Sequence, residues 1–157
     1  MCGLASESGA YLMTAGEMAD REAIRILMAQ YNIAGDRGRL EELAATFAPD
    51  GTICFEGVAT TGRAAIAARL AAGPANPDLG VVRHHLSTSL IELNGPEASA
   101  RTYFQVLTNI GLDHHGVYVD WLRKGEDGWR FARRDVRIDW QAPDSLFAPM
   151  RVRGVAG

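Results

Sequence analysis

Residues 31–38, Y-N-I-A-G-D-R-G, close the first clear helical pattern of the chain, and the rest of the sequence is interpreted around them. Before them, apolar residues recur at a spacing of three and four, as on one face of an α-helix: Ile24, Leu27, Met28 and Tyr31. Tyr31 is therefore expected on the buried face. Asp36 follows Tyr31 by five residues, a rotation of about 140° that would point the two side chains apart in an unbroken helix.

Gly35 is predicted to end this helix and to let the chain turn between the two side chains. A second, short helix is predicted over residues 40–47, where Leu40, Leu43 and Phe47 share a face. An aspartate in such a corner is usually solvated. Asp36 therefore becomes a candidate for chemistry only if a buried partner faces it.

The composition is that of an ordinary soluble globular domain. The 157 residues are 47% hydrophobic and 22% charged, and the formal net charge is -3. The acidic balance gives no indication of nucleic-acid binding, and no basic amphipathic helix indicates a membrane surface. We expect one domain over residues 17–157, preceded by a flexible extension over residues 1–16.

The two cysteines, Cys2 and Cys54, form neither a disulfide framework nor a metal-binding spacing. The first residues lack the basic start and apolar run of a signal peptide, and no stretch is long and apolar enough to span a bilayer. We therefore expect a protein of the reducing cytoplasm, without a metal site built on cysteines.

The chain passes from helices to strands. A short strand is predicted over 52–57, and a third helix over 60–73. Two long hairpins follow, formed by 81–93 with 98–110 and by 116–123 with 129–140. In the last strand the apolar parity changes between Phe131 and Val136, which predicts a bulge near Arg133 and Arg134. The predicted class is α+β, with a curved antiparallel sheet wrapped on three helices.

Three segments in this order resemble one family: residues 31–38 with F-A-P-D-G after them, R-H-H-L-S-T-S-L-I-E-L (83–93), and G-W-R-F-A-R-R-D-V-R-I-D-W (128–140). They resemble the SnoaL-like branch of the nuclear-transport-factor-two superfamily. That branch also holds scytalone dehydratase, bile acid 7-alpha-dehydratase and hexachlorocyclohexane dehydrochlorinase. The resemblance covers residues 20–140 and implies a cone-shaped α+β barrel, whereas function varies widely within the superfamily.

His84 and His85 are adjacent on a predicted strand, so only one of them can face the interior of the cone. Matching H-L-S-T-S to the family motif selects His85 as the partner of Asp36. Such a carboxylate would hold one imidazole nitrogen and make the other a better base, with Tyr31 as a hydrogen-bond donor. The alternatives are a core histidine at His85 and a packing role for Tyr31.

The resemblance also implies an arginine in the pocket, and it selects Arg134. The predicted bulge leaves Arg133 as the alternative. The apolar side chains expected to form either a pocket wall or a closed core are Phe55, Phe104, Val106 and Trp140. Scytalone dehydratase and bile acid dehydratase carry a second polar pocket residue on the strand after the histidine strand. Here that strand offers Tyr103, Gln105 or Asn109 instead. His114 and His115 are predicted in a loop, without a metal.

The function favoured by this resemblance is a lyase or isomerase that uses no cofactor and acts on a small, apolar molecule, cyclic molecules included. The alternative is a non-catalytic ligand-binding or assembly module. A filled cone interior or a solvated Asp36 would favour this alternative. The tail after Trp140 is apolar at Leu146, Phe147, Pro149 and Met150. We expect it to pack on a second copy of the chain in a homodimer or homotrimer.

Overall fold

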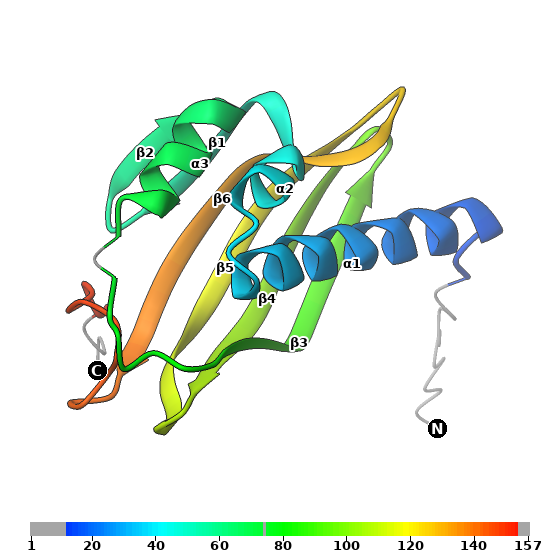
Figure 1. Ribbon diagram of the computed structural model, residues 1–157. Coiled ribbons are helices and arrows are strands. Elements are labelled where there is room, and N and C mark those ends of the chain that lie inside the picture. Colours follow the sequence, from blue (N-terminus) through cyan, green and yellow to red (C-terminus); the bar gives the residue numbers. More distant parts are fainter. Residues whose placement is uncertain (1–11, 74, 154–157) are drawn as a thin grey trace, which may run out of the picture.

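The computed structural model describes residues 12–73 and 75–153 and confirms the predicted α+β class (Figure 1). Within these residues, three helices lie on one face of a curved six-stranded sheet of order β2-β1-β6-β5-β4-β3. The elements in chain order are α1 (Ala15–Asp36), α2 (Leu40–Ala45), β1 (Phe47–Phe55), β2 (Val58–Thr61), α3 (Arg63–Ala71), β3 (Val82–Asn94), β4 (Glu97–Thr108), β5 (Gly111–Gly125) and β6 (Gly128–Gln141).

Helix α1 begins at Ala15, inside the predicted extension. Thr14 and Glu17 form a capping box: the Thr14 hydroxyl accepts from the Glu17 backbone N–H at 3.1 Å, and the Glu17 carboxylate accepts from the Thr14 backbone N–H at 2.7 Å. The predicted boundary at residue 17 is therefore late. Residues 1–11 of the predicted extension lie outside the described residues.

The break predicted at Gly35 is wrong, because α1 continues through Asp36 and the turn follows at Gly38, whose φ is 67°. Gly35 serves packing instead. A Cβ atom there would lie 3.2 Å from Leu43 Cδ1, so the missing side chain lets α2 pack closely on the end of α1. Asp36 is consequently fixed as the last residue of a helix.

The sheet is mixed, which corrects the predicted antiparallel sheet. β1 runs parallel to β6, pairing Phe47 with Phe131 and Phe55 with Val136, and every other neighbouring pair is antiparallel. β1 also begins earlier than predicted, and β2 occupies the predicted start of the third helix. A tight turn at Glu56 and Gly57, both with positive φ, reverses the chain between β1 and β2.

The segment 111–115, predicted as a loop, is the first part of β5 and pairs with β4. Gly111, with a φ of 97°, makes the turn from β4 tight enough for pairing to resume at once. The pairing of β5 with β6 shifts register between Trp121 and Leu122, opposite Phe131 and Arg133. The predicted irregularity of the last strand is therefore confirmed.

The core lies between α1 and the concave face of the sheet, where the predicted apolar stripe of α1 is buried. The apolar tail was expected to pack on a second copy of the chain. Its residues Phe147 and Met150 instead pack against the core of the same chain. The homo-oligomer stays a prediction. Within the described residues, no helix combines the length and apolarity needed to cross a membrane.

Candidate functional site

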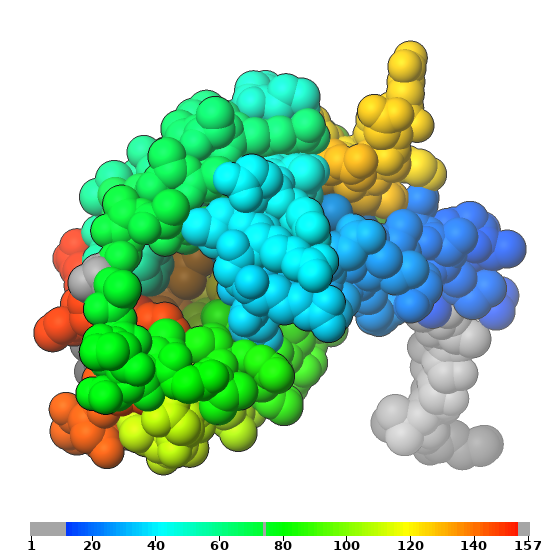
Figure 2. Space-filling view, viewed as in Figure 1, coloured from blue at the N-terminus to red at the C-terminus, as the bar shows by residue number. Residues whose placement is uncertain are grey.

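A cavity of about 570 Å³ opens between the helices and the concave face of the sheet. In Figure 2 the molecule is hollowed between α2 in cyan, the green segment that follows α3, and the red C-terminal segment. The walls are mainly apolar and aromatic, and they include Tyr31, Phe55, Leu70, Phe104, Tyr118, Val136, Ile138, Leu146, Phe147 and Met150. A hollow of this size and character is typical of a small-molecule site.

An Asp–His pair stands at the wall of this cavity. The Nδ1 atom of His84 lies 2.6 Å from Oδ1 of Asp36, and the backbone N–H of His84 also donates to Oδ2 at 3.0 Å. The His84 ring lines the cavity, and Asp36 lies behind it with 10% of its side chain exposed. Because an ionised carboxylate only accepts hydrogen bonds, Nδ1 of His84 carries the hydrogen and Nε2 is left to exchange a proton.

His84, and not His85, is thus the partner of Asp36, which corrects the prediction. His85 lies on the exposed face of β3. The physical reason is the shift in the pairing of β3 with β4 between Leu86 and Ser89. Residues 82, 84 and 86 turn inward before that shift, and residues 89, 91 and 93 do so after it. A motif that is aligned on the residues after the shift therefore assigns the inward position to His85 instead of His84.

Tyr31 lines the cavity as predicted, and its ring packs edge-on against Phe47, Tyr118 and Phe131, with centroids 5.9–6.0 Å apart. Burial raises the pKa of the Tyr31 hydroxyl, although the nearby Arg134 guanidinium works in the opposite direction. The phenol therefore stays protonated and can donate a hydrogen bond. Tyr118 is a second cavity phenol that the sequence did not single out; its hydroxyl donates to Asn32 at 3.3 Å.

Arg134 faces inward, as predicted, but it is fully buried and does not line the cavity. Two nitrogens of its guanidinium donate to Asp120 at 2.8 Å, and its Cζ lies 4.1–4.2 Å from the ring centroids of Tyr31, Tyr118 and Phe131. Burial works to lower the pKa of Arg134, but the Asp120 charge outweighs it and raises the pKa. The aromatic floor of the cavity therefore covers a permanent positive charge, and Arg134 cannot contact a ligand directly.

Arg133, the alternative pocket arginine, is exposed on the other face, where it donates to Asp135 at 2.7 Å. Of the four predicted wall residues, Phe55 and Phe104 line the cavity. Val106 is fully buried in the core. Trp140 is 40% exposed and stacks on His115 outside the cavity, because alternate residues of a strand face opposite sides of the sheet.

His114 is a cavity residue that sequence reasoning missed, because residues 111–115 were expected in a loop. Its Nδ1 lies 2.7 Å from Oδ1 of the fully buried Asp113, so the cavity holds a second Asp–His pair. The ring packs edge-on against Phe104 and Phe147. A signal was present: D-H-H, like R-H-H before it, places one of two adjacent histidines on each face of a strand.

The environment sets the charges of this second pair. Burial alone would raise the pKa of Asp113, but hydrogen bonds from His114, Ser145 and the Leu146 backbone outweigh it and hold the pKa below its ordinary value. Burial lowers the pKa of His114 and outweighs the opposite effect of Asp113. The pair is therefore an ionised carboxylate beside a neutral imidazole at neutral pH.

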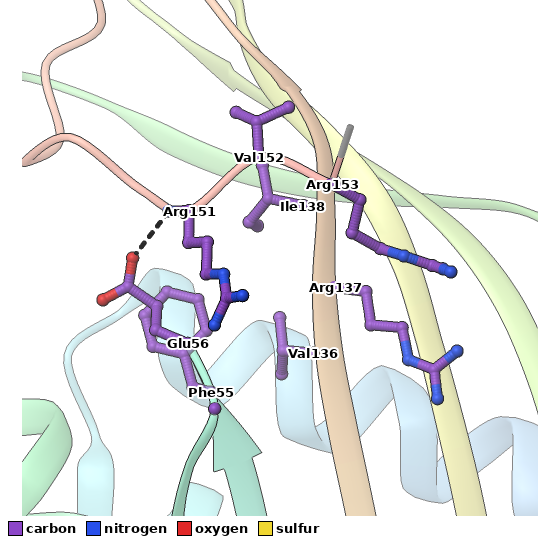
Figure 3. A pocket seen from close by; sticks show the side chains of 9 residues that line it. Phe55, Glu56, Val136, Arg137, Ile138, Arg151, Val152 and Arg153 are labelled. Atoms are coloured by element: carbon purple, nitrogen blue, oxygen red, sulfur yellow. Dashed lines mark hydrogen bonds between the residues drawn. The ribbon is translucent and has the colours of Figure 1, made fainter. Parts of the chain in front are cut away.

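A second hollow, of about 600 Å³, lies where β1 ends beside β6 (Figure 3). Its wall includes Phe55, Val136 and Ile138, which also line the cavity, and the Arg151 backbone N–H donates to Glu56 at 3.0 Å there. This hollow has no histidine in its wall among the described residues. Across residues 12–73 and 75–153, no three His, Cys, Asp or Glu side chains converge as a metal site would require.

The SnoaL-like domain family matches residues 16–135, which is most of the chain. The chain belongs to this family. The SnoaL-like assignment agrees with the cone of helices and curved sheet, and the fold is that of the nuclear-transport-factor-two superfamily. No curated protein matches the chain.

Solved structures extend the comparison of this SnoaL-like domain. A protein from Catenulispora acidiphila in complex with S-DNPA is 29% identical, with a TM-score of 0.69 over 78% of this chain and 95% of that one. Rv3472, a protein of unknown function from Mycobacterium tuberculosis, is 28% identical, with a TM-score of 0.69 over 83% of each chain. An NTF2-like protein from Novosphingobium aromaticivorans is 26% identical, with a TM-score of 0.70 over 88% and 99%.

Proposed function

We propose that this SnoaL-like domain is a lyase of the dehydratase type, or an isomerase, that moves protons on a small, largely apolar ring compound without a cofactor. The observation that carries the proposal is the contact of 2.6 Å between His84 Nδ1 and Asp36 at the wall of an apolar cavity. A carboxylate that fixes one imidazole nitrogen leaves the other as an oriented proton carrier, which is the basic requirement of general acid–base catalysis.

The site also offers a group that can polarise the substrate. The protonated Tyr31 hydroxyl can donate to a carbonyl or a leaving hydroxyl, and this donation strengthens as negative charge develops on that oxygen. Proton removal next to a polarised carbonyl gives an enol. Return of the proton at another carbon is isomerisation, and loss of a neighbouring hydroxyl as water is dehydration. An imidazole in the cavity and the Tyr31 hydroxyl can therefore serve either outcome.

The walls favour an apolar ring as the substrate. Phe104 and Tyr118 stack with centroids 4.3 Å apart and an interplanar angle of 15°, and both line the cavity. Flat aromatic faces of this kind suit a ring better than a charged chain. The relative from Catenulispora acidiphila, 29% identical, is in complex with a small molecule, S-DNPA, and supports a small-molecule ligand for this chain as well.

Two observations favour a catalytic function over a non-catalytic binding or assembly module. The cone is not filled, since about 570 Å³ is open, and Asp36 is turned away from solvent onto His84. A ligand carrier would need neither an oriented imidazole nor a buried carboxylate behind it.

Two simple bicyclic probes test the proposal. Exchange of the hydrogens beside the carbonyl of α-tetralone in D₂O, followed by NMR, reports proton removal. Its β-hydroxy derivative loses water to give a naphthol, and fluorescence follows the loss. We expect the wild type to accelerate at least one reaction above buffer, and His84→Gln to lose acceleration of dehydration on the order of 100-fold or more. His85→Gln is the matched control. Acceleration of neither reaction, or equal dehydration rates for the two variants, would contradict the proposal.

A further inference from the structure

We infer that His114, held by Asp113, is a second proton-transfer residue of the cavity and acts as the base that removes a carbon-bound proton, while His84 serves the leaving group. The inference rests on the proposed function and adds a division of labour to it. It also narrows the substrate class to cyclic β-hydroxy ketones, whose acidic C–H and leaving hydroxyl stand on neighbouring carbons.

The register of the sheet sets the two histidines opposite each other. His84 on β3 and His114 on β5 are both direct partners of Val106 on β4, so the three residues form one row across the sheet. Two strand spacings separate the outer members by about 10 Å, enough for a ring to lie between them. The Phe104 ring packs near both imidazoles, with its centroid 6.3 Å from that of each.

The Asp113–His114 pair is built to hold the imidazole in one orientation. The carboxylate of Asp113 is fully buried and accepts from His114 Nδ1 at 2.7 Å, from the Ser145 hydroxyl at 2.7 Å and from the Leu146 backbone N–H at 2.9 Å. With its hydrogen on Nδ1, the neutral ring presents an unprotonated Nε2. This is the state that a base needs before it takes a proton.

A purely structural role would not require the imidazole. Asp113 ties down the C-terminal segment through Ser145 and the Leu146 backbone, and neither contact involves the His114 ring. The His114 ring instead adds a second imidazole, besides that of His84, to a cavity whose other walls are mostly apolar. Besides Asp113, the charged or titratable neighbours that act on His114 are His84 and His115, and both disfavour its protonated form.

The chemistry balances with these two residues. Nε2 of His114 takes the proton next to the carbonyl, and the carbon–hydrogen electron pair forms the new carbon–carbon double bond. The carbon–oxygen bond of the leaving group breaks as the protonated ring of His84 donates a proton to the departing hydroxyl, which leaves as water. His114 then holds the added proton and His84 lacks one, and exchange with solvent restores both.

The experiment separates the two half-reactions with the probes already named. Exchange in α-tetralone needs only a base, whereas dehydration of its β-hydroxy derivative needs the base and the acid. We expect His114→Gln to lower both rates on the order of 100-fold or more, and His84→Gln to lower dehydration by that factor while exchange stays within a few-fold of wild type. His115→Gln and His85→Gln change neighbouring histidines on the outer face, and their rates should match wild type.

Thermal unfolding of each variant establishes that it is folded, and Asp113→Asn provides a second route to the same question. By loosening the orientation of His114, it should lower exchange while the protein still binds α-tetralone. If the exchange and dehydration rates of His114→Gln and of Asp113→Asn both equal those of the wild type, the inference is overturned and the proposed function still stands. An inactive wild type would overturn the proposed function itself.

Discussion

Asp36 accepts hydrogen bonds from both the ring and the backbone of His84, at 2.6 Å from Nδ1 and 3.0 Å from the backbone nitrogen. The double contact fixes the end of α1 to the start of β3 and sets the tautomer of the histidine in a single arrangement. The Asp36 carboxylate therefore both joins two elements of the fold and orients the imidazole for proton transfer.

Replacing Asp36 by Asn should keep the shape of this contact and remove its charge. The amide can still accept, but it no longer stabilises a protonated imidazole, so we expect the dehydration rate to fall on the order of 10²–10⁴-fold. Nitrogen NMR of the histidine rings should show His84 losing its fixed Nδ1–H form. Asp139→Asn, at an exposed position of β6, is the control. An Asp36→Asn rate equal to that of the control would argue against the pair.

The buried ion pair of Arg134 with Asp120 predicts a strong effect on stability. Arg134→Met leaves a fully buried carboxylate without its partner, which should lower the free energy of unfolding by about 3–5 kcal/mol. The double variant Arg134→Met with Asp120→Leu removes both charges and should recover most of that loss. Chemical denaturation measures both.

Arg133→Met is the control, because the exposed contact of Arg133 with Asp135 should contribute no more than about 1 kcal/mol. The account of Arg134 would be wrong if Arg133→Met were the more destabilising change, or if the double variant were less stable than Arg134→Met.

Gly116 sits where the pairing of β5 with β6 shifts register. A Cβ atom there would overlap the Arg137 carbonyl oxygen, so Gly116→Ala must push two strands apart. We expect a loss of roughly 1–3 kcal/mol in thermal or chemical unfolding. Gly125→Ala, at the end of the same strand with open space around it, should cost much less. Equal losses would show that the close approach at Gly116 is not the cause.

His114 predicts a dependence of stability on pH. Its pKa in the folded protein lies below the ordinary 6.5, so the unfolded chain binds this proton more readily than the folded protein does. Stability should therefore decrease as pH falls from about 6.5 toward the lowered pKa, and His114→Gln should remove that decrease. Asp113, also with a lowered pKa, stabilises the fold above about pH 4 and loses this effect on acidification. Denaturant midpoints measured at a series of pH values check both signs; a wild type that gains stability below pH 6.5 would refute the first.

Local patterns were sufficient for the elements themselves. The apolar stripe that ends at Tyr31 determined a buried helix, and the Asn94–Gly95 and Glu126–Asp127 turns determined the hairpins, because periodicity and turn chemistry act over a few residues. The resemblance to the SnoaL-like family, and not these local patterns, placed Asp36 beside a histidine of the 83–93 strand. Local patterns also indicated the irregularity of the last strand, since a change in apolar parity is visible in one chain segment.

Only the tertiary structure decided which side chains meet. The register shift between Leu86 and Ser89 turns His84 inward instead of His85, and pairing of residues 111–115 with β4 brings His114 to the cavity. Asp113 meets Ser145 across 32 positions, and Arg134 meets Asp120 beneath an aromatic floor. Such contacts depend on strand register and on the folding back of a distant segment. Neither leaves a period or a spacing in the sequence, because each is a property of two segments packed together.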